Sequence, residues 1–399
     1  MSATRLLFYS HDTFGLGHFR RSLTIATHLR RHIPDCSVLI LTGLEAAYAF
    51  ETPPGIDFVK LPAVKKVGPD AYRSRHLRIS FNRVKRLREH LIKAVAKSFD
   101  PHLFVVDNVP RGVDGELLPT LEFLRVHRPA TRIVLTLRDL LDEPGRIVPQ
   151  WRTWNVYELL EHGYDDIWVV GWRDLFDPTA LYEFPPAVAA KTRFCGYIVQ
   201  QPDPAVTDAI RLELRLDDRP LAMVSVGGGG DGFPLLRTYA DVVDELAATG
   251  LRTAMFLGPD LPPSQRTELK QLLLPRPDML LFDFRPDLVS FLPLAAITVS
   301  MAGYNTVAEV LAYRKRAVVI PRTFPRREQW IRAQTLARRG LLATLDLDAL
   351  SAPALLAAIR ERLLAPLPPE GAVDLGGLRR IARRARHLLD LPESAGMPE

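Results

Sequence analysis

The sequence contains little cysteine for its length. Its 399 residues include two cysteines, Cys36 and Cys195, which lie far apart in the chain. Two distant thiols supply neither a disulfide framework nor a cluster of zinc ligands, so we expect a protein of the reducing cytoplasm. An aromatic ladder, a zinc spacing and other recognition motifs for nucleic acid are also missing, and we predict no nucleic-acid partner.

The sequence also lacks a segment with the pattern of a membrane anchor. The apolar run near the N-terminus is too short for a signal peptide, and Asp12 follows it almost at once. Residues 288–308 carry no charge and reach about the length of a spanning helix. They nevertheless include Pro293, Gly303 and Asn305. We interpret them as a buried strand, a glycine loop and the start of a helix.

Positive charge is concentrated in one part of the chain. The net charge is +6, but residues 65–97 hold eleven Lys or Arg against two acidic residues, so the remainder is slightly acidic. Within residues 73–97, apolar side chains at positions 77, 84, 87, 91 and 95 follow the spacing of one helix face. Two interpretations stay open: a helix that lies on an anionic membrane surface, and an ordinary amphipathic helix that covers a sheet.

Short apolar runs alternate with helical patterns along the chain. This alternation is typical of α/β domains in which helices cover both faces of a parallel sheet. A polar, proline-bearing stretch at residues 200–208 separates two such series and is the predicted linker. The expected strands are residues 5–10, 37–42, 102–107, 132–137 and 166–171 in the first series, and 221–226, 252–258, 279–284, 296–301 and 317–322 in the second.

We therefore predict an α/β protein with two Rossmann-like doubly wound domains. The first spans residues 1–199 and the second spans residues 200–372. Residues 373–399 form a C-terminal helix and tail, which we expect to pack back on the first domain.

A strand of the second series leads into four consecutive glycines, Gly227 to Gly230, and then into a helix with Pro234 near its first turn. Glycines let the backbone approach a ligand closely, and a helix N-terminus favours anions such as phosphate. The spacing also satisfies the dinucleotide pattern, but Gly258 stands where that pattern needs an acidic residue. A structural turn is the simpler alternative. Because four glycines exceed what a turn needs, we favour a phosphate-binding loop.

Residues 300–330 contain a second candidate for ligand binding. A strand ends at the small-residue loop MAGYN, and a helix carrying Glu309 follows. A carboxylate beside a helix start can accept two hydroxyl hydrogens, as binding of a ribose diol requires. A solvated surface glutamate is the alternative. After the next strand, Glu328 and Gln329 offer groups that can bond sugar hydroxyls.

The first strand of the chain leads into the segment SHDTFGLGHFRRS. Gly15 and Gly17 remove side chains where the chain turns, and His18 then stands at the opening of a helix. Ligands of doubly wound folds gather at the carboxyl ends of the strands. The helix end and the neighbouring arginines, Arg20 and Arg21, lower the pKa of His18 and keep the ring neutral, as a general base must be. The alternative is a histidine that caps the helix.

These motifs resemble those of glycosyltransferases of the GT-B fold, in the inverting family 28 of the peptidoglycan N-acetylglucosaminyltransferase MurG and the monogalactosyldiacylglycerol synthases. The chain is most similar to a bacterial group of predicted glycosyltransferases in this family. The resemblance covers nearly the whole chain and is most specific in GLGHFRR and in MAGYNTVAEVLAYRKRAVVIP with the following REQW. It implies two domains that face a central cleft, with Gly15, Gly17 and Arg21 on the acceptor side and His18 as the general base.

The resemblance also implies a set of donor-binding residues. Glu309 would bind the nucleotide ribose, and Glu328 and Gln329 would bind the donor sugar, although Glu328 departs from the paired glutamines of the family. The remaining contacts are Gly227, Gly228, Gly229 and Gly230 to the diphosphate, Gly303, Tyr304 and Asn305 to the diphosphate or the sugar, and the backbone near Phe284 and Arg285 to uracil.

The expected activity is that of an inverting hexosyltransferase that needs no metal or cofactor. It would move a hexose or N-acetylhexosamine from a UDP-sugar to a hydroxyl of a lipid-linked or polysaccharide-precursor acceptor, at the inner face of the membrane. Asp107 is our first choice for the acid that orients His18 and Asp139 the second, although either could be a turn or cap residue. The one Asp-x-Asp pattern, Asp346 to Asp348, comes late in the chain and is given little weight as a metal site.

Two other functions remain open for this fold. The nucleotide-sugar hydrolases of the pseudaminic acid pathway share the Gly-x-Gly-His-x-x-Arg pattern, and in them water replaces the acceptor. A sugar-nucleotide sensor without catalytic activity is the third hypothesis.

Overall fold

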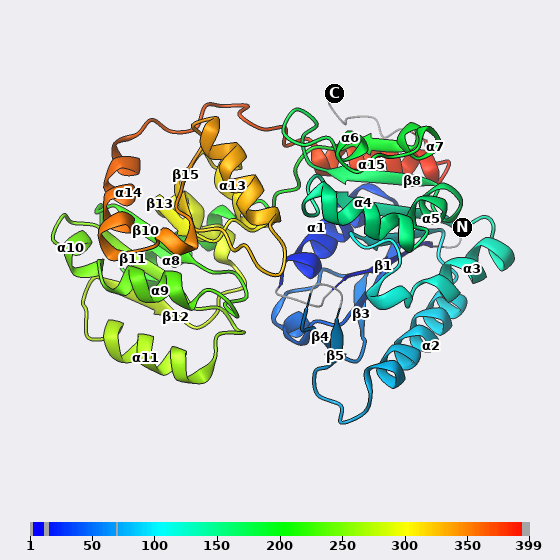
Figure 1. Ribbon diagram of the computed structural model, residues 1–399, viewed down its shortest axis with the longest axis horizontal. Coiled ribbons are helices and arrows are strands. Elements are labelled where there is room, and N and C mark those ends of the chain that lie inside the picture. Colours follow the sequence, from blue (N-terminus) through cyan, green and yellow to red (C-terminus); the bar gives the residue numbers. More distant parts are fainter. Residues whose placement is uncertain (1–2, 12–15, 69–70, 393–399) are drawn as a thin grey trace. The chain divides into compact units, whose positions relative to one another are not determined.

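The computed structural model describes residues 3–11, 16–68 and 71–392, and the chain divides into two compact units. Unit 1 comprises Met1–Ile198 together with Asp374–Glu399, and unit 2 comprises Val199–Val373. Figure 1 shows strands and helices alternating along the chain in both units. The predicted fold class, an α/β protein with two doubly wound domains, is confirmed.

Unit 1 is built on one parallel sheet. Its strands are β1 (Thr4–Tyr9), β2 (Cys36–Thr42), β3 (Ile56–Lys60), β6 (Leu103–Asp107), β7 (Arg132–Arg138), β8 (Asp166–Val170) and β9 (Thr192–Phe194). They pair in the order β3-β2-β1-β6-β7-β8-β9. Because β1 lies between β2 and β6, the direction of the crossovers reverses at β1, and loops at the carboxyl ends of β1 and β6 adjoin each other. A separate antiparallel hairpin joins β4 (Val64–Lys66) and β5 (Tyr72–Ser74).

Helices cover both faces of this sheet. On one face α1 (Gly17–His32) contacts the first three strands, and on the other α2 (Phe81–Phe99) packs beside α3 (Leu118–His127). The other helical segments of unit 1 are η1 (Glu45–Ala49), η2 (Val113–Gly115), α4 (Pro144–Thr153), α5 (Val156–Gly163), α6 (Pro178–Leu181), α7 (Pro186–Ala190) and α15 (Gly377–Leu388).

The helix stripe predicted within residues 73–97 is only partly correct. Tyr72–Ser74 form strand β5, and the helix begins at Phe81. The buried row of α2 is Val84, Arg88, Ile92 and Ala96, whereas Leu77 and Leu87 are 46% and 42% exposed. Residues spaced by four lie on one helix face, which here faces the sheet. Arg88 belongs to this buried row, whereas Leu87 does not.

A buried ion pair explains why an arginine occupies that position. Nε and Nη2 of Arg88 each lie 2.6 Å from an oxygen of the Glu116 carboxylate, and both side chains are almost fully buried. The hydroxyl of Tyr9 donates to the same carboxylate at 2.5 Å. A paired and hydrogen-bonded charge can be buried where a lone one cannot. The network joins α2 to β1.

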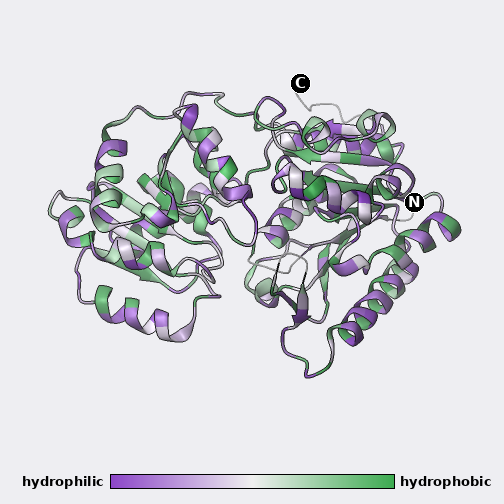
Figure 2. Cartoon of the chain, viewed as in Figure 1, coloured by the Kyte–Doolittle hydropathy of each residue, from purple (hydrophilic) through white to green (hydrophobic). Residues whose placement is uncertain are grey.

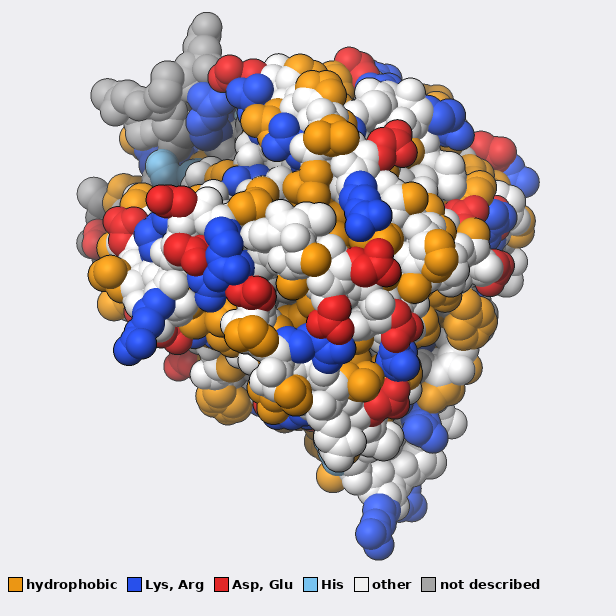
Figure 3. Space-filling view, turned by 90° about the vertical axis from the view of Figure 1, so that its left-hand side faces the viewer, with side chains coloured by type: hydrophobic (Ala, Val, Ile, Leu, Met, Phe, Trp, Pro, Cys, Tyr) orange, Lys and Arg blue, Asp and Glu red, His pale blue; other side chains and the backbone are white. Residues whose placement is uncertain are grey.

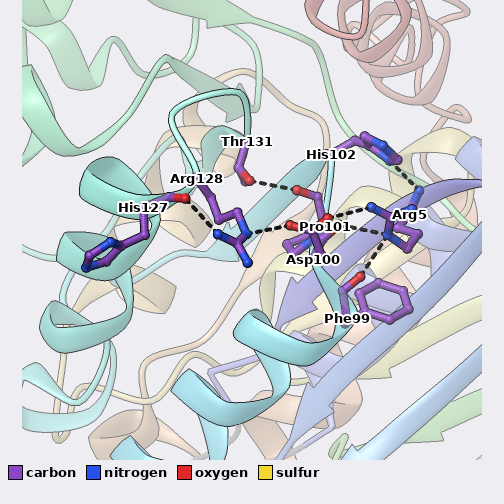
Figure 4. Close-up of polar contacts among 8 residues, drawn as sticks. All are labelled: Arg5, Phe99, Asp100, Pro101, His102, His127, Arg128 and Thr131. Carbon is purple, nitrogen blue, oxygen red and sulfur yellow. Dashed lines mark hydrogen bonds and ion pairs between the residues drawn. The ribbon is translucent and has the colours of Figure 1, made fainter.

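A second polar network lies at the opposite, amino-terminal edge of the sheet (Figure 4). Asp100 ends α2 in the left-handed conformation, with φ 48°. Its carboxylate accepts hydrogen bonds from Arg5 at 2.9 Å and from Arg128 at 2.8 Å. Arg5 also donates to the carbonyl oxygens of Phe99 and Asp100. This network fixes the end of α2 against the start of β1, away from the edge where ligands gather in such folds.

The C-terminal helix α15 packs against α1 in unit 1. Nε of Arg384 donates to Oδ2 of Asp166 at 2.5 Å, and Nε1 of Trp168 donates to the same oxygen at 2.8 Å. Asp166 on β8 is fully buried. A buried carboxylate requires such partners, so α15 stabilises the sheet of unit 1.

Unit 2 is also built on one parallel sheet. Its strands are β10 (Leu221–Ser225), β11 (Arg252–Phe256), β12 (Met279–Phe282), β13 (Ala295–Ser300), β14 (Arg316–Val319) and β15 (Ala343–Thr344), in the order β12-β11-β10-β13-β14-β15. One row of paired residues, Phe282, Phe256, Ser225, Ser300 and Val319, crosses the first five of these strands. The loops that follow these strands therefore start at one edge of the sheet.

Most helices of unit 2 lie between these strands in sequence. The helices of this unit are α8 (Pro204–Glu213), α9 (Phe233–Ala240), α10 (Val243–Ala247), α11 (Pro263–Leu273), η3 (Leu288–Leu294), α12 (Tyr304–Ala312), α13 (Glu328–Arg338), η4 (Leu347–Ala349) and α14 (Ala352–Leu364). Of these, α8 lies before β10, and η4 and α14 lie after β15. The strand, loop and helix predicted within residues 288–308 are confirmed, with η3 preceding β13.

The linker predicted at residues 200–208 is wrong in its second half. Pro204 opens α8, and Oδ1 of Asp203 accepts a hydrogen bond from the backbone N–H of Ala205 at 2.9 Å. An N-cap aspartate followed by proline at the first helical position is a helix start. Asp203 and Pro204, which suggested a linker, are the residues that start α8.

Hydrophobic residues are concentrated on the strands of both sheets (Figure 2). On the side of the molecule where Figure 1 places α10 and α11, acidic and basic side chains are mixed (Figure 3). The ion pair of Arg237 with Glu268 connects α9 to α11, and that of Arg276 with Asp244 connects the segment after α11 to α10. Within the ranges that the structure describes, no helix combines the length and the apolar character needed to cross a membrane.

Candidate functional site

The first glycine loop leads to a histidine that contacts an acid from another element. His18 lies in the first turn of α1, and Asp107 is the last residue of β6. Nδ1 of His18 lies 2.5 Å from Oδ2 of Asp107. Arg21, one turn further along α1, donates to Oδ1 of Asp107 from Nε at 3.1 Å and also from Nη2. Three residues predicted for this site are thus in direct contact, and the alternative that His18 caps its own helix is wrong.

The charges around His18 determine where its proton lies. Burial alone would raise the pKa of Asp107, but Arg21 and His18 outweigh it and hold the pKa of that carboxyl well below its usual range. Burial lowers the pKa of His18 from 6.5, although Asp107 opposes the shift. An ionised carboxylate has no proton to donate. Nδ1 of His18 is therefore protonated and donates the hydrogen bond that Asp107 accepts. Nε2 of the neutral ring is then the proton acceptor.

Two neighbours of His18 were missed in the sequence. The ring of His11, which follows β1, stands edge-on to that of His18 with the ring centres 5.7 Å apart. The charge of Arg138, the last residue of β7, contributes to the lowered pKa of His18. Nε of Arg138 donates to Oδ1 of Asn108 at 3.1 Å. Each of these polar residues stands at the carboxyl end of a predicted strand, which is the signal that could have found them.

Asp139, the second choice for the orienting acid, has a different partner. It follows β7, is fully buried and accepts a hydrogen bond from the hydroxyl of Tyr197. Its Cβ would lie 2.3 Å from a Cβ added to Gly171, so the two chain segments are tightly packed. Asp107 is the acid that holds the ring of His18. Gly17 is the first residue of α1, and Gly15 lies outside the described residues.

The second glycine loop connects β10 to α9 in unit 2. Gly229 has φ +89°, and a Cβ there would stand 2.3 Å from the carbonyl oxygen of Leu257. On the adjoining loop Gly258 has φ +85°, and a Cβ there would stand 2.6 Å from the carbonyl oxygen of Gly227. These two glycines permit close packing of the loops. Gly227 and Gly230 are exposed, and a Cβ on Gly227 would meet no atom within 4 Å. The exposed glycines leave space for a ligand before the N-terminus of α9.

Glu309 lies on α12, after the neighbouring strand β13. It is 6% exposed, so the alternative of a solvated surface glutamate is wrong. Burial and the charge of Glu309 raise the pKa of Tyr313 to about 12. A carboxylate is buried at low cost only where charges or hydrogen-bond donors surround it.

The MAGYN loop before α12 is held by an arginine that the sequence analysis missed. Gly303 caps α12, Tyr304 is buried and Asn305 is half-buried. Arg332 on α13 is 1% exposed, and its guanidinium carbon lies 5.7 Å from the ring centre of Tyr304. Its Nη1 donates to the carbonyl oxygen of Ala302 at 3.4 Å. Arg332 stands four residues after Glu328, on the same helix face, and that spacing was the available signal.

Glu328 and Gln329 open α13 and are both buried. Oε1 of Glu328 accepts a hydrogen bond from Nη2 of Arg322 at 3.0 Å, and Oε1 of Gln329 accepts one from the backbone N–H of Arg322 at 3.4 Å. Nη1 of Arg322 lies 3.4 Å from Oδ2 of Asp231, next to the glycine loop. Burial would lower the pKa of Arg322, but the two carboxylates raise it. Glu328 is therefore part of an ion pair, and Arg322 is a further residue that the sequence analysis missed.

Phe284 and Arg285 follow β12 at the same edge of the sheet and are half-buried. The guanidinium of Arg285 donates to Asp287 at 2.9 Å and 2.8 Å and to Glu213 at 3.1 Å. These acids hold the side chain of Arg285. The contact with uracil that we predict here is therefore one made by backbone atoms.

Asp346 and Asp348 flank the first residue of the short turn η4. Oδ1 of Asp346 accepts hydrogen bonds from Trp330 at 2.8 Å and from Gln334 at 3.3 Å. In the part of the chain that the structure describes, no group of three or more His, Cys, Asp or Glu residues could hold a metal ion.

Comparisons with known proteins gave a sequence match within unit 2 and structural matches to the fold. Residues 223–370, most of unit 2, match the model of the glycosyltransferase family 28 C-terminal domain. No curated protein sequence matches the chain.

Solved structures match over almost the whole length. They include the glycosyltransferase SnogD from Streptomyces nogalater, with 18% identity, 98% of this chain and 96% of that chain covered, and a TM-score of 0.55. UGT71G1 of Medicago truncatula, complexed with UDP-glucose, has 14% identity, 97% and 98% coverage and a TM-score of 0.58. A UDP-N-acetylglucosamine 2-epimerase has 11% identity, 99% and 100% coverage and a TM-score of 0.60. At these identities the structural matches establish the fold.

Together the matches support a fold of the GT-B glycosyltransferase type. The segment that matches the family 28 C-terminal domain lies within unit 2.

Proposed function

We propose that the protein is an inverting hexosyltransferase that transfers a hexose or N-acetylhexosamine from a UDP-sugar to an acceptor hydroxyl. The contact of 2.5 Å between His18 and Asp107 is the observation that carries this proposal. A neutral histidine whose Nδ1 is held by a carboxylate is a suitable general base near neutral pH. Unit 1 supplies this base, and unit 2 binds the donor.

The proposed reaction begins with proton transfer from the acceptor hydroxyl to Nε2 of His18. The acceptor oxygen attacks the anomeric carbon on the face opposite the nucleotide, and the bond from that carbon to the diphosphate oxygen breaks. Its electron pair leaves with UDP, so the configuration inverts. Asp107 stabilises the imidazolium that forms, and Arg21 keeps Asp107 ionised.

The leaving UDP gains negative charge in this step. The glycine loop at Gly227 to Gly230 precedes the N-terminus of α9, where the helix potential favours anions. Preorganised donors of this kind stabilise a developing negative charge, and we propose that transfer needs no metal ion. The test is the transfer rate after dialysis against EDTA: full activity is expected, and a loss restored by Mg²⁺ or Mn²⁺ would refute metal independence.

The donor assignment rests on the residues around the carboxyl edge of the unit 2 sheet. We assign Glu309 to the ribose, Gly303 to Asn305 to the diphosphate or sugar, Glu328 and Gln329 to the sugar, and the backbone at Phe284 and Arg285 to uracil. UGT71G1, which shares the fold, was solved with UDP-glucose. Thermal-shift measurements with UDP, GDP and dTDP test the base: UDP at 100 times its Kd should add about 2.7 kcal/mol of stability. No shift with UDP would contradict the assignment.

For the acceptor we propose a lipid-linked or polysaccharide precursor that meets the basic segment, residues 73–97. Leu77, Ile79 and Leu87 are 46%, 40% and 42% exposed among its cations. Exposed apolar side chains among basic ones favour binding to an anionic bilayer surface. Co-sedimentation with phosphatidylglycerol vesicles should exceed that with phosphatidylcholine vesicles and fall with salt. Equal binding to both would contradict a peripheral membrane location.

Hydrolysis of a nucleotide sugar is the alternative reaction for the same histidine, with water in place of the acceptor. Measuring UDP release with and without candidate acceptors separates the two. Release that requires an acceptor supports transfer, whereas release at full rate without one identifies a hydrolase.

A further inference from the structure

Arg322 in unit 2 lies between two carboxylates from different elements. It follows β14, and its Nη2 lies 3.0 Å from Oε1 of Glu328 at the start of α13. On the other side, its Nη1 lies 3.4 Å from Oδ2 of Asp231, which directly follows Gly230. Asp231 lies in the loop after β10 and Arg322 in the segment after β14, and β13 lies between these two strands in the sheet. The arginine therefore reaches across the end of β13 to the glycine loop.

The contacts that the guanidinium makes with Glu328 and with Asp231 are unequal. The Glu328 side chain is 3% exposed, and its contact has the distance of a good charge-assisted hydrogen bond. The Asp231 side chain is 32% exposed, and its contact is longer. An ion pair at a partly solvated carboxylate contributes little free energy and is readily exchanged. Glu328 is thus the permanent partner of Arg322, and Asp231 is the replaceable one.

The replaceable contact lies beside the loop that is expected to bind an anion. Gly227 and Gly230 are exposed there, and α9 begins just after the loop. A guanidinium presents donors in a planar fork that fits phosphate oxygens, and it stays charged at all relevant pH values. A diphosphate held by the loop would compete with the carboxylate of Asp231 for the same side of Arg322.

We propose that Arg322 binds the diphosphate of the nucleotide-sugar donor and that Asp231 is the partner it exchanges for this diphosphate. The inference rests on the proposed function and adds to it a cation beside the leaving group. Glu328 holds the guanidinium in place on the side away from the diphosphate. Asp231 acts against donor binding, because it competes for Arg322 and repels the incoming phosphate oxygens.

The test compares binding of uridine, UDP and inorganic pyrophosphate to the full-length protein by isothermal titration calorimetry. Arg322→Gln should weaken UDP and pyrophosphate binding at least about tenfold, which is the scale of one charge-assisted hydrogen bond, and change uridine binding less than about twofold. Asp231→Asn should tighten UDP and pyrophosphate binding, by about twofold to tenfold on the same scale, and leave uridine unchanged. Arg338→Gln, on the exposed end of α13, is the matched control and should behave as the wild type.

If Arg322 exchanges Asp231 for the diphosphate, the affinity for UDP should fall in Arg322→Gln and rise in Asp231→Asn. If the Arg322 to Asp231 contact only ordered the loop, both variants would weaken UDP binding, and that result would overturn the inference. Equal losses for uridine and UDP in Arg322→Gln would also overturn it. Asp231→Asn changes a partly exposed side chain, so it tests the idea even if Arg322→Gln folds poorly.

The pyrophosphate measurement separates this inference from the proposed function. If wild-type protein binds pyrophosphate in an Arg322-dependent way but does not bind UDP, the diphosphate site stands and the uridine donor is wrong. If it binds UDP with no contribution from Arg322, the donor stands and the inference is wrong.

Discussion

His18 and Asp107 are separated by 89 positions in the chain, yet Nδ1 of the histidine lies 2.5 Å from Oδ2 of the aspartate. The contact arises because β1 and β6 are neighbours in the sheet, with Tyr9 paired to Val106. The residue after Val106 then reaches the first turn of the helix that follows β1. The sheet order thus positions a base and its orienting acid from distant parts of the sequence.

Replacing His18 with Gln should lower the transfer rate by about 10²- to 10⁴-fold, the usual contribution of a general base. The affinity for UDP should stay within about twofold, because unit 2 binds the nucleotide in our proposal and removing a hydrogen bond to UDP would weaken its binding by more than this. Initial rates and calorimetric titration with UDP measure the two quantities. His127→Gln on the exposed end of α3 is the matched control. Unchanged transfer in His18→Gln would remove His18 from the mechanism.

The pH dependence of transfer follows from the lowered pKa of His18. The base works when neutral, so activity should fall as the pH drops through that pKa, with a midpoint below 6.5. The charge of Asp107 raises the pKa of His18. Asp107→Asn should therefore move the acidic limb of the rate profile to still lower pH while reducing the plateau. A limb that moves to higher pH would show that Asp107 does not act on His18 through its charge.

Removing the buried cation of α2 should destabilise unit 1. Arg88→Met leaves the carboxylate of Glu116 buried without its ion pair, and breaking such a pair costs about 3–5 kcal/mol. Urea unfolding measures the change in free energy. Arg86→Met changes an exposed arginine on the same helix and should stay within about 0.5 kcal/mol of the wild type. Similar losses for both variants would mean that helix propensity, and not the ion pair, determines the effect.

Two glycines of the second loop should respond differently to alanine. Gly229→Ala places a Cβ 2.3 Å from the carbonyl oxygen of Leu257, so the two loops must move apart. We expect a loss of thermal stability of at least about 2 kcal/mol, because overpacking adds to the cost of positive φ. Gly227→Ala has positive φ but open space, so about 1–2 kcal/mol is expected. A larger loss for Gly227→Ala would contradict this assignment of packing roles.

The fold class and most strands could be predicted from the amino-acid sequence alone. Most of the expected strands are short apolar runs buried on both faces of their sheet, which makes the pattern easy to recognise. The sequence analysis missed β3, where Asp57 faces solvent and interrupts the run, and the strands of two or three residues, β4, β5, β9 and β15. It also placed His18, Asp107 and the glycine loop at strand ends, because ligands of parallel sheets gather there.

The contacts between these side chains could not be predicted from the sequence, because they depend on how the strands are ordered in the sheet. The order of strands in a sheet depends on crossovers that leave no local mark in the sequence, so the choice of Asp107 over Asp139 required the paired strands. Three further contacts likewise depend on partners in distant elements. They are the ion pair of Arg88 with Glu116, the bond from Arg384 of the C-terminal helix to Asp166, and the contacts of Arg322 with Glu328 and Asp231. From the sequence alone, a charged residue is expected at the surface. Its burial becomes favourable only where the fold brings an opposite charge close to it.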